Sequence, residues 1–393
     1  MAPSIPPHDP LTDGGFETLC GHYGEHRLAH GGAAAPPLYQ SSTFVYPDAE
    51  AFERRHLPTN PYFDYTRQSN PTTAMLEVKL AALEHGEWAR CYGSGMGAIT
   101  GAVGACLAAG SHIVAVDNCY PPTRTYLEQY LSRFGVTTTF VRGTNPDDFI
   151  ACLRDDTRIV YLESPTWGRL EVLEVAAIAE AARARGATVV FDNSWATPYF
   201  QNPLDLGCDI VVHSMSKYIG GHSDVLGGVA IGRSSDLGRR IKEEGELVGA
   251  VLDPFAAWLH LRSLRTLAVR MEQHERSGLE IARMLADDSR VQRVLHPGLP
   301  SHEGHEAAKE QMRGYGGVFA FALAEQSREA THRFINRLRV FHIGCGWGGA
   351  ESLAIGGTLF DRNSTKPLWL IRLHVGLETA EDLLSDVRRA LED

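Results

Sequence analysis

The sequence has no long apolar run and no excess of basic charge. No stretch approaches the roughly 20 consecutive apolar residues of a membrane helix. The proline-rich first 15 residues have neither a basic start nor an apolar core, so we expect a disordered leader and no export. Lys and Arg number 37 against 48 Asp and Glu, a net charge of −11, without any Lys/Arg-rich segment. We therefore predict a cytoplasmic protein with neither a membrane nor a nucleic-acid partner.

Cysteines are few, and the histidines do not complete a metal site. The seven cysteines (residues 20, 91, 106, 119, 152, 208 and 345) are an odd set without a C-x-x-C pair, which predicts reduced thiols. His22, His26 and His30 are spaced as on one helix face, but no cysteine or carboxylate completes a zinc site and nearby glycines weaken the helix. HEGHE at 302–306 is not H-E-x-x-H, because its histidines are three residues apart. We predict no metal.

The order of apolar runs predicts an α/β protein. With 393 residues and 44% hydrophobic content, the chain exceeds one core, so we expect two domains. Five β-branched runs alternate with amphipathic helical stretches, which is typical of a mostly parallel sheet with helices on both faces. These runs are 113–117, 137–141, 158–164, 188–193 and 209–214. We expect an extended segment over 1–58, a large domain over 59–252 and a smaller α+β domain over 253–393.

Lys217 follows the last of these runs, at the mouth of a buried strand. A lysine in this position, flanked by the hydroxyls of Ser214 and Ser216, can form a Schiff base with an aldehyde cofactor while the hydroxyls bind its phosphate. Asp192 ends the neighbouring run and places a carboxylate where it can keep a pyridine nitrogen protonated. These residues together predict pyridoxal 5′-phosphate.

A glycine-rich turn at 93–98 opens a helical stretch. Free amides and the positive end of the helix dipole favour an anion there, so Gly95 and Met96 are predicted to cradle a phosphate. GSGMGA also resembles the G-x-G-x-x-G of dinucleotide-binding enzymes, which makes an NAD enzyme the rival reading. The spacing does not fit that fingerprint, and Asp117 does not complete it.

Longer motifs resemble a known family. DNSWATP at 192–198, HSMSKYIGGHSDVLGG at 213–228, ESLAIGG at 351–357 and IRLHVGLE at 371–378 resemble the cysteine and methionine metabolism family of fold-type-I pyridoxal-phosphate enzymes. That family includes cystathionine lyases, methionine γ-lyase and cystathionine γ-synthase. The resemblance runs from about Tyr39 to the C-terminus. It implies the fold-type-I architecture and a homotetramer built from dimers that share active sites.

The resemblance also implies roles for single residues. Tyr65 and Arg67 match the pair that reaches the partner's site and binds the cofactor phosphate, and the irregular chain from 36 to 70 suits a contact with a neighbouring subunit. Tyr120 matches the aromatic that stacks on the pyridine ring, and it joins Lys217 and Tyr65 as a candidate catalytic residue. Arg372 lies within an apolar strand pattern, where burial favours an anionic partner, and it matches the arginine that binds the substrate carboxylate.

Two departures leave the reaction open. Trp167 stands where relatives place Asn or Ser, and Gly346 stands where they place serine, so both alter the predicted substrate pocket beside Trp347. The motifs around Trp347 and Arg372 look most like cystathionine β-lyases, so our first reading is a carbon–sulfur lyase performing α,β-elimination on cystathionine or a related amino acid. The alternative is γ-elimination or γ-replacement on a homoserine ester, cystathionine, methionine or a specialised substrate such as a γ-halo amino acid. A non-catalytic regulatory protein on the same fold is the third reading.

Overall fold

The computed structural model describes residues 14–57, 59–358 and 368–392. Its helices are α1 (Phe16–His22), α2 (Ala49–Glu53), α3 (Pro71–Leu83), α4 (Gly95–Gly104), α5 (Pro121–Thr125), α6 (Pro146–Ala151), α7 (Val175–Ala184), α8 (Thr197–Phe200), α9 (Ser235–Val248), α10 (Pro254–Leu264), α11 (Leu267–Ala286), α12 (His305–Gln311), α13 (Arg328–Arg337) and α14 (Ala380–Leu391). Its strands are β1 (Trp88–Tyr92), β2 (His112–Val116), β3 (Thr137–Val141), β4 (Thr157–Glu163), β5 (Thr188–Asp192), β6 (Ile210–Ser214), β7 (Gly228–Gly232), β8 (Val291–Leu295), β9 (Val318–Leu323), β10 (His342–Ile343), β11 (Leu353–Gly357) and β12 (Leu370–His374).

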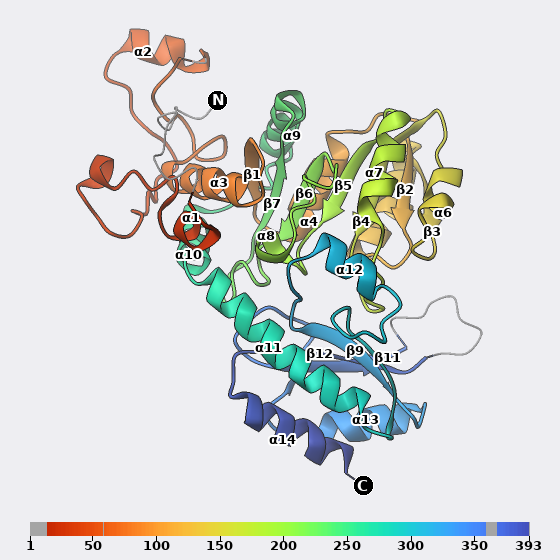
Figure 1. Cartoon of the computed structure of the whole chain (residues 1–393). Helices are drawn as coiled ribbons and strands as arrows, with labels where there is room; N and C mark the ends of the chain where they lie inside the picture. Colours follow the sequence, from red (N-terminus) through yellow and green to blue (C-terminus); the bar gives the residue numbers. More distant parts are fainter. Residues whose placement is uncertain (1–13, 58, 359–367, 393) are drawn as a thin grey trace.

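The large sheet has seven strands in the order β1-β7-β6-β5-β4-β2-β3 (Figure 1). The five predicted strands are β2 to β6, and they pair in parallel. β7 runs antiparallel to both β6 and β1, and β1 was not predicted from the sequence. The expectation of a mostly parallel sheet is therefore confirmed.

Helices cover both faces of this sheet, because its buried strands are apolar on both sides. Alternate residues of β6 belong to different cores: Val212 packs with residues of α4 and α7, whereas Val211 packs with residues of α3 and α10. The ends of the parallel strands are consequently the places where polar side chains gather.

The C-terminal part is a smaller α+β unit, as expected. Its five strands follow the order β10-β11-β12-β9-β8, and α11, α13 and α14 pack around them (Figure 1). α10 and α11 are separate helices, because the chain leaves helical geometry at Thr266. α10 packs on α3 beside the large sheet, and α11 continues to the small one. The division of the chain at residue 252 stays a prediction.

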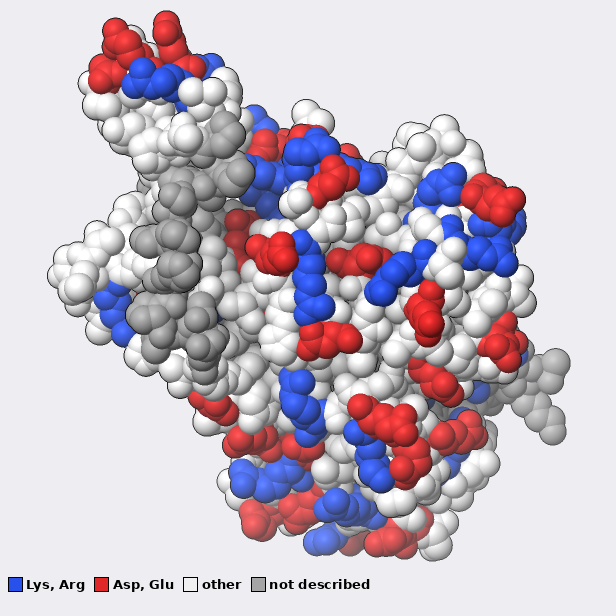
Figure 2. Space-filling model, turned by 45° about the horizontal axis from the view of Figure 1, so that its top comes forward, with Lys and Arg blue, Asp and Glu red and all other residues white. Residues whose placement is uncertain are grey.

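The N-terminal segment has two parts, of which the first packs on the body of its own chain and the second is largely exposed to solvent. α1 packs on α3 and α11 of its own chain, and the buried Lys79 ammonium donates to Glu25 at 2.7 Å. The chain over residues 36–57 and 59–69 forms an arm. Its part around α2 stands clear of the body (Figure 1 and Figure 2), whereas its two ends are bonded to the body, from the Tyr39 amide to the Thr72 hydroxyl at 2.9 Å and from Arg67 to the Glu246 carbonyl at 2.6 Å. Its apolar side chains are unusually open to solvent: Val45 is 89% exposed. The contact of this segment with a neighbouring subunit stays a prediction.

The spacing of His22, His26 and His30 does not form a helix face. α1 ends at His22, and His26 has left-handed backbone geometry with φ 37°. Within residues 14–57, 59–358 and 368–392, no three or more His, Cys, Asp and Glu side chains gather as metal ligands would. None of the helices described is both long and apolar enough to cross a membrane. All seven cysteines are free thiols. The predicted disordered leader lies outside the described residues.

Candidate active site

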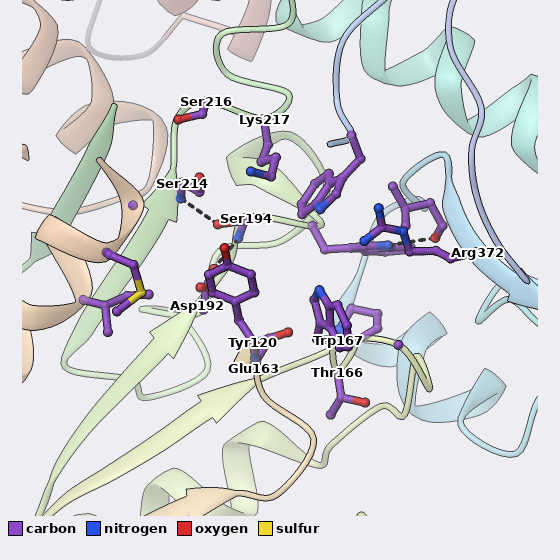
Figure 3. A pocket seen from close by; sticks show the side chains of 18 of the residues that line it. Tyr120, Glu163, Thr166, Trp167, Asp192, Ser194, Ser214, Ser216, Lys217 and Arg372 are labelled. Carbon is purple, nitrogen blue, oxygen red and sulfur yellow. Dashed lines mark hydrogen bonds between the residues drawn. The ribbon is translucent and has the colours of Figure 1, made fainter. Parts of the chain in front are cut away.

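A cavity of about 230 Å³ lies beyond the carboxyl ends of β4, β5 and β6, where the C-terminal unit meets the large sheet (Figure 3). Ligands of open parallel sheets bind at such strand ends. Most predicted site residues line it: Gly95, Met96, Tyr120, Trp167, Asp192, Ser214, Ser216, Lys217, Trp347 and Arg372. Their meeting in one cavity was expected from the sequence, whereas their roles remain predictions.

Lys217 projects into the cavity from the turn after β6 (Figure 3). The turn is held by backbone bonds on both sides of the lysine, from the Lys217 amide to the Ser214 carbonyl at 3.1 Å and from the Gly221 amide to the Lys217 carbonyl at 2.7 Å. Burial lowers the pKa of the Lys217 ammonium, and the Asp192 carboxylate partly opposes that shift. A lowered pKa favours the neutral amine, the form that acts as a nucleophile or general base.

Asp192 ends β5, on the other side of the same cavity (Figure 3). The Ser194 amide donates to its Oδ1 at 2.9 Å, and the Ser194 hydroxyl accepts from the Ser214 amide at 2.7 Å. Burial raises the pKa of the Asp192 carboxyl, while the bonds from Ser194 and the charges of His213 and Lys217 favour the anion. The anionic form of this buried acid would be stabilised most by a cationic partner in the cavity.

The phosphate cradle predicted at Gly95 and Met96 falls at the start of α4. Ser94 is the N-cap of this ten-residue helix, its hydroxyl accepts from the Gly97 amide at 3.0 Å, and Ser94, Gly95 and Met96 line the cavity. Gly95 permits the close approach of α4 to Ser214, because a Cβ there would lie 2.8 Å from the Cβ of Ser214. Ser216 lines the cavity too, but its hydroxyl is already bonded to the Gly227 backbone at 3.0 Å. Ser214 is therefore the better placed hydroxyl for an anion.

Tyr120 is the N-cap residue of α5, and its ring borders the cavity with 39% of the side chain exposed. Its amide donates to Oε2 of Glu163 at 2.8 Å. Burial raises the pKa of the Tyr120 phenol, with the Cys345 thiol and the Glu163 carboxylate adding to the shift. The phenol consequently keeps its proton at neutral pH.

Glu163 is a cavity residue that the sequence analysis missed. It ends β4, pairs with Asp192 across the β4–β5 ladder and is 9% exposed. Burial raises the pKa of Glu163 well above its usual value, and the neighbouring Asp192 charge raises it further. The signal was present in the sequence, because Glu163 follows a buried run in the same way as Asp192 does.

Arg372 lies within β12 and is 4% exposed. Its Nη2 donates to the carbonyls of Cys345 at 2.6 Å and Gly346 at 3.3 Å, and its Nε has no hydrogen-bond partner among the described residues. Burial lowers the pKa of this guanidinium to about 10. A buried cation held by two neutral carbonyls is suited to an incoming carboxylate. Gly346 contributes through its carbonyl and does not itself line the cavity.

Two indoles narrow the cavity on its substrate side. Trp347 places its ring centroid 5.5 Å from Nζ of Lys217 and packs edge-on against Tyr218. Trp167 borders the opposite wall, near Arg372 (Figure 3). The prediction that Trp167 and Trp347 belong to the pocket agrees with their positions.

Tyr65 and Arg67 lie outside the cavity of their own chain. Tyr65 is bridged to Thr43 within the arm, and Nη1 of Arg67 donates to the carbonyl of Glu246 at the end of α9 at 2.6 Å. Neither residue borders the site formed by Lys217. Their predicted contact with a cofactor phosphate therefore requires the site of a second subunit.

The residues present fit pyridoxal 5′-phosphate. Lys217 would hold its aldehyde carbon, Asp192 its ring nitrogen, and the amides of α4 with Ser214 its phosphate. The cofactor supplies an electron sink for charge that develops on the substrate. The buried Asp192 and the space at Gly95 support this fit. Burying a carboxylate costs free energy unless a cationic group compensates for it, and the absence of a Cβ at Gly95 brings the start of α4 close to Ser214.

Comparisons with known proteins agree with this arrangement. Residues 17–392 match the family described as Cys/Met metabolism PLP-dependent enzyme. The chain is 39% identical to L-methionine gamma-lyase of Pseudomonas deceptionensis over 391 residues, covering 96% of this chain and 97% of the relative. It is 36% identical to cystathionine gamma-lyase of Dictyostelium discoideum over 380 residues, covering 94% and 96%.

Two further relatives extend the comparison. Cystathionine gamma-synthase of Mycobacterium bovis is 39% identical over 366 residues, covering 92% of each chain. The crystal structure of metB from Corynebacterium glutamicum superposes with a TM-score of 0.91 at 34% identity, covering 98% of this chain and 99% of that one. The match extends over both sheets, so it includes the fold-type-I architecture and the cavity between them. The chain therefore belongs to the Cys/Met metabolism family of pyridoxal-phosphate-dependent enzymes.

Proposed function

We propose that this enzyme eliminates or replaces the γ-substituent of an amino acid. The proposal rests mainly on the relatives, whose names all refer to the γ-carbon. A methionine γ-lyase, a cystathionine γ-lyase and a cystathionine γ-synthase each match more than 90% of the chain. These comparisons favour the alternative reading of the sequence over α,β-elimination. The substrate class is a γ-substituted amino acid such as cystathionine, methionine or a homoserine ester.

The cavity residues support a division of labour in this reaction. The Arg372 guanidinium binds the substrate carboxylate and thereby orients the α-carbon. The amine of Lys217 removes the α-proton, because its lowered pKa favours the neutral base. The Tyr120 phenol remains protonated and is placed to donate to the leaving group. Loss from the γ-carbon also needs a proton removed at the β-carbon, and Lys217, the amine of the described cavity lining, is the candidate base.

Product analysis tests the proposal. The purified, cofactor-loaded enzyme is incubated with cystathionine and, separately, with O-succinylhomoserine, and the products are identified by mass spectrometry. We expect 2-oxobutyrate from either compound, with cysteine released from cystathionine. Adding cysteine to the homoserine ester distinguishes replacement from elimination, because replacement yields cystathionine.

The same experiment would contradict the proposal if the substituent is lost from the β-carbon instead of the γ-carbon. Homocysteine with pyruvate from cystathionine would mean α,β-elimination, the reading that the Trp347 motif favoured. The enzyme with Arg372→Ala is the control: it keeps the cofactor residues and should require a much higher amino-acid concentration for the same turnover.

We also infer that the active unit is at least a dimer, with Arg67 completing the partner's cavity. The support is that Arg67 and Tyr65 lie outside their own cavity, on an arm whose apolar side chains are largely exposed. Leu247 and Val248, at the end of α9 where Arg67 is anchored, are 85% and 66% exposed and extend the same apolar surface. Such a surface suits a second copy of the chain. The homotetramer and a reducing, cytoplasmic location belong to the same proposal.

Mixed subunits test the shared site. We expect Arg67→Ala and Lys217→Ala each to inactivate the enzyme alone, whereas a mixed dimer would contain one intact cavity. Refolding the two variants together at equal amounts should restore about a quarter of the wild-type activity, because half of the dimers are mixed and each has one working site. The activity of unmixed variants is the control. Absence of any recovery, with mixed dimers verified by native mass spectrometry, would place Arg67 outside the site.

A further inference from the structure

Trp167 sits in a short loop after β4 that closes on itself. The Thr166 amide donates to the Glu171 carbonyl at 2.9 Å, and the Leu170 amide donates to the Thr166 carbonyl at 3.1 Å. The Thr166 hydroxyl accepts from the Glu171 amide at 3.1 Å. Three bonds within six residues close the loop, so the backbone that carries the indole has a defined conformation.

The same loop is tied to the cofactor side of the cavity by Glu163. The Glu163 carboxylate accepts from the backbone of both Tyr120 and Trp167. It also stands beside Asp192 in the β4–β5 ladder. The backbone of Trp167 is thus held by β4, the strand next to the one that carries Asp192.

The indole reaches the C-terminal sheet. Trp167 packs against the cluster of Ala322 on β9 and Leu370 on β12. Leu370 and Arg372 are two residues apart on one strand, so their side chains leave the same face about 7 Å apart. Ile355, which pairs with Arg372, packs on this cluster as well. Trp167 therefore rests on the sheet face from which Arg372 enters the cavity.

We propose that Trp167 is a positioning residue that fixes the distance between Asp192 on the large sheet and Arg372 on the small one. The inference rests on the proposed function only in taking Arg372 as the receptor of the substrate carboxylate. The guanidinium itself is held by two carbonyls of one loop. The strand that carries it needs a rigid contact across the cavity, because a displacement of about 1 Å can cost up to about 10²-fold in rate.

Binding of L-alanine tests this role independently of the reaction. Alanine has the α-amino and α-carboxylate groups but no leaving group, so its Kd can be read from the absorbance change of the bound cofactor. Trp167→Ala should raise that Kd about tenfold, a difference of about 1.4 kcal/mol. Trp167→Phe, which keeps an aromatic contact with Leu370, should restore it to within about twofold. The Kd of the cofactor should not change in either variant.

A double-mutant cycle identifies the route of the effect. Leu370→Val shortens the side chain that contacts Trp167 from β12, so this variant alone should also raise the Kd of alanine. If Trp167→Ala does not fold, Leu370→Val provides the test. If the two residues act through one contact, combining the variants should add little to the larger single effect. Additive effects would mean that Trp167 does not act through β12.

Glu171→Gln is the matched control in the same loop. Its carboxylate accepts from Asn118 at 3.3 Å, lies 3.6 Å from Arg169 and does not border the cavity, so alanine binding should stay at the wild-type value. Unchanged alanine binding in Trp167→Ala would overturn the inference even if γ-products form. Weakened alanine binding together with β-products would overturn the proposed function and leave the inference standing.

Discussion

Replacing Lys217 with alanine is expected to reduce turnover by about 10⁴-fold, because one side chain supplies both the attachment point of the cofactor and the general base. No other basic side chain that the structure describes in the cavity lining can take over proton removal, since Arg372 is a guanidinium. The visible absorbance of the covalently held cofactor should disappear as well. Steady-state kinetics and an absorbance spectrum of the purified variant measure the two effects.

Two controls make the Lys217 result specific. Reduction of the wild-type enzyme with borohydride, followed by peptide mass spectrometry, should find the cofactor attached to Lys217. Lys309→Ala removes a lysine of α12 that is 53% exposed and pairs with Glu306, and it should leave turnover unchanged. Retention of the absorbance and the turnover in Lys217→Ala would refute the central assignment of the site.

Replacing Asp192 with asparagine is expected to have opposite effects on activity and on stability. Asparagine keeps an oxygen for the Ser194 amide but removes the charge that faces the cofactor ring. We expect turnover to fall by about 10³-fold, as for the loss of a strong electrostatic contact in an active site. Cofactor affinity, measured by equilibrium dialysis, should weaken as well. Asp209→Asn, at the opposite end of the neighbouring strand, is the control and should retain the cofactor.

The cofactor-free form of Asp192→Asn should be more stable than the cofactor-free wild type at neutral pH, by about 1 kcal/mol. Burial raises the pKa of Asp192 in the folded chain, so folding binds protons and the charged carboxylate opposes folding above that pKa. The difference should shrink as the pH falls through the folded pKa toward the unfolded value, because the wild-type acid is then neutral. Urea denaturation at several pH values measures it; a less stable variant at neutral pH would contradict the argument.

The strands and the central site residues were predictable from local pattern. The buried runs that form β5 and β6 are β-branched and end in polar residues, so Asp192 and Lys217 were already at neighbouring strand ends in the sequence. Arg372 was identifiable because a guanidinium within an apolar strand calls for an anion. The ranking of β- over γ-elimination rested on the two C-terminal motifs around Trp347 and Arg372, whereas the whole-chain comparisons favour γ-enzymes.

Other features depend on contacts that local pattern does not contain. β1 escaped prediction because Arg90 interrupts its apolar residues; its guanidinium binds the carbonyls of Arg67 and Gln68 at 3.1 and 2.9 Å. The roles of Glu163 and Trp167 depend on neighbours brought together by the fold, since Trp167 meets Leu370 only where the two sheets approach. Such pairings follow from tertiary packing rather than from periodicity.

The closed loop from 166 to 171 has a consequence for engineering. Three of its hydrogen bonds are internal, and the bond from Trp167 to Glu163 of β4 uses backbone of the loop, so none of these bonds requires a particular side chain at position 167. Grafting the corresponding six residues of a γ-lyase into this chain would exchange one wall of the pocket and leave the strand ends beneath it in place. Substrate preference in this enzyme is thereby open to redesign through one short peptide.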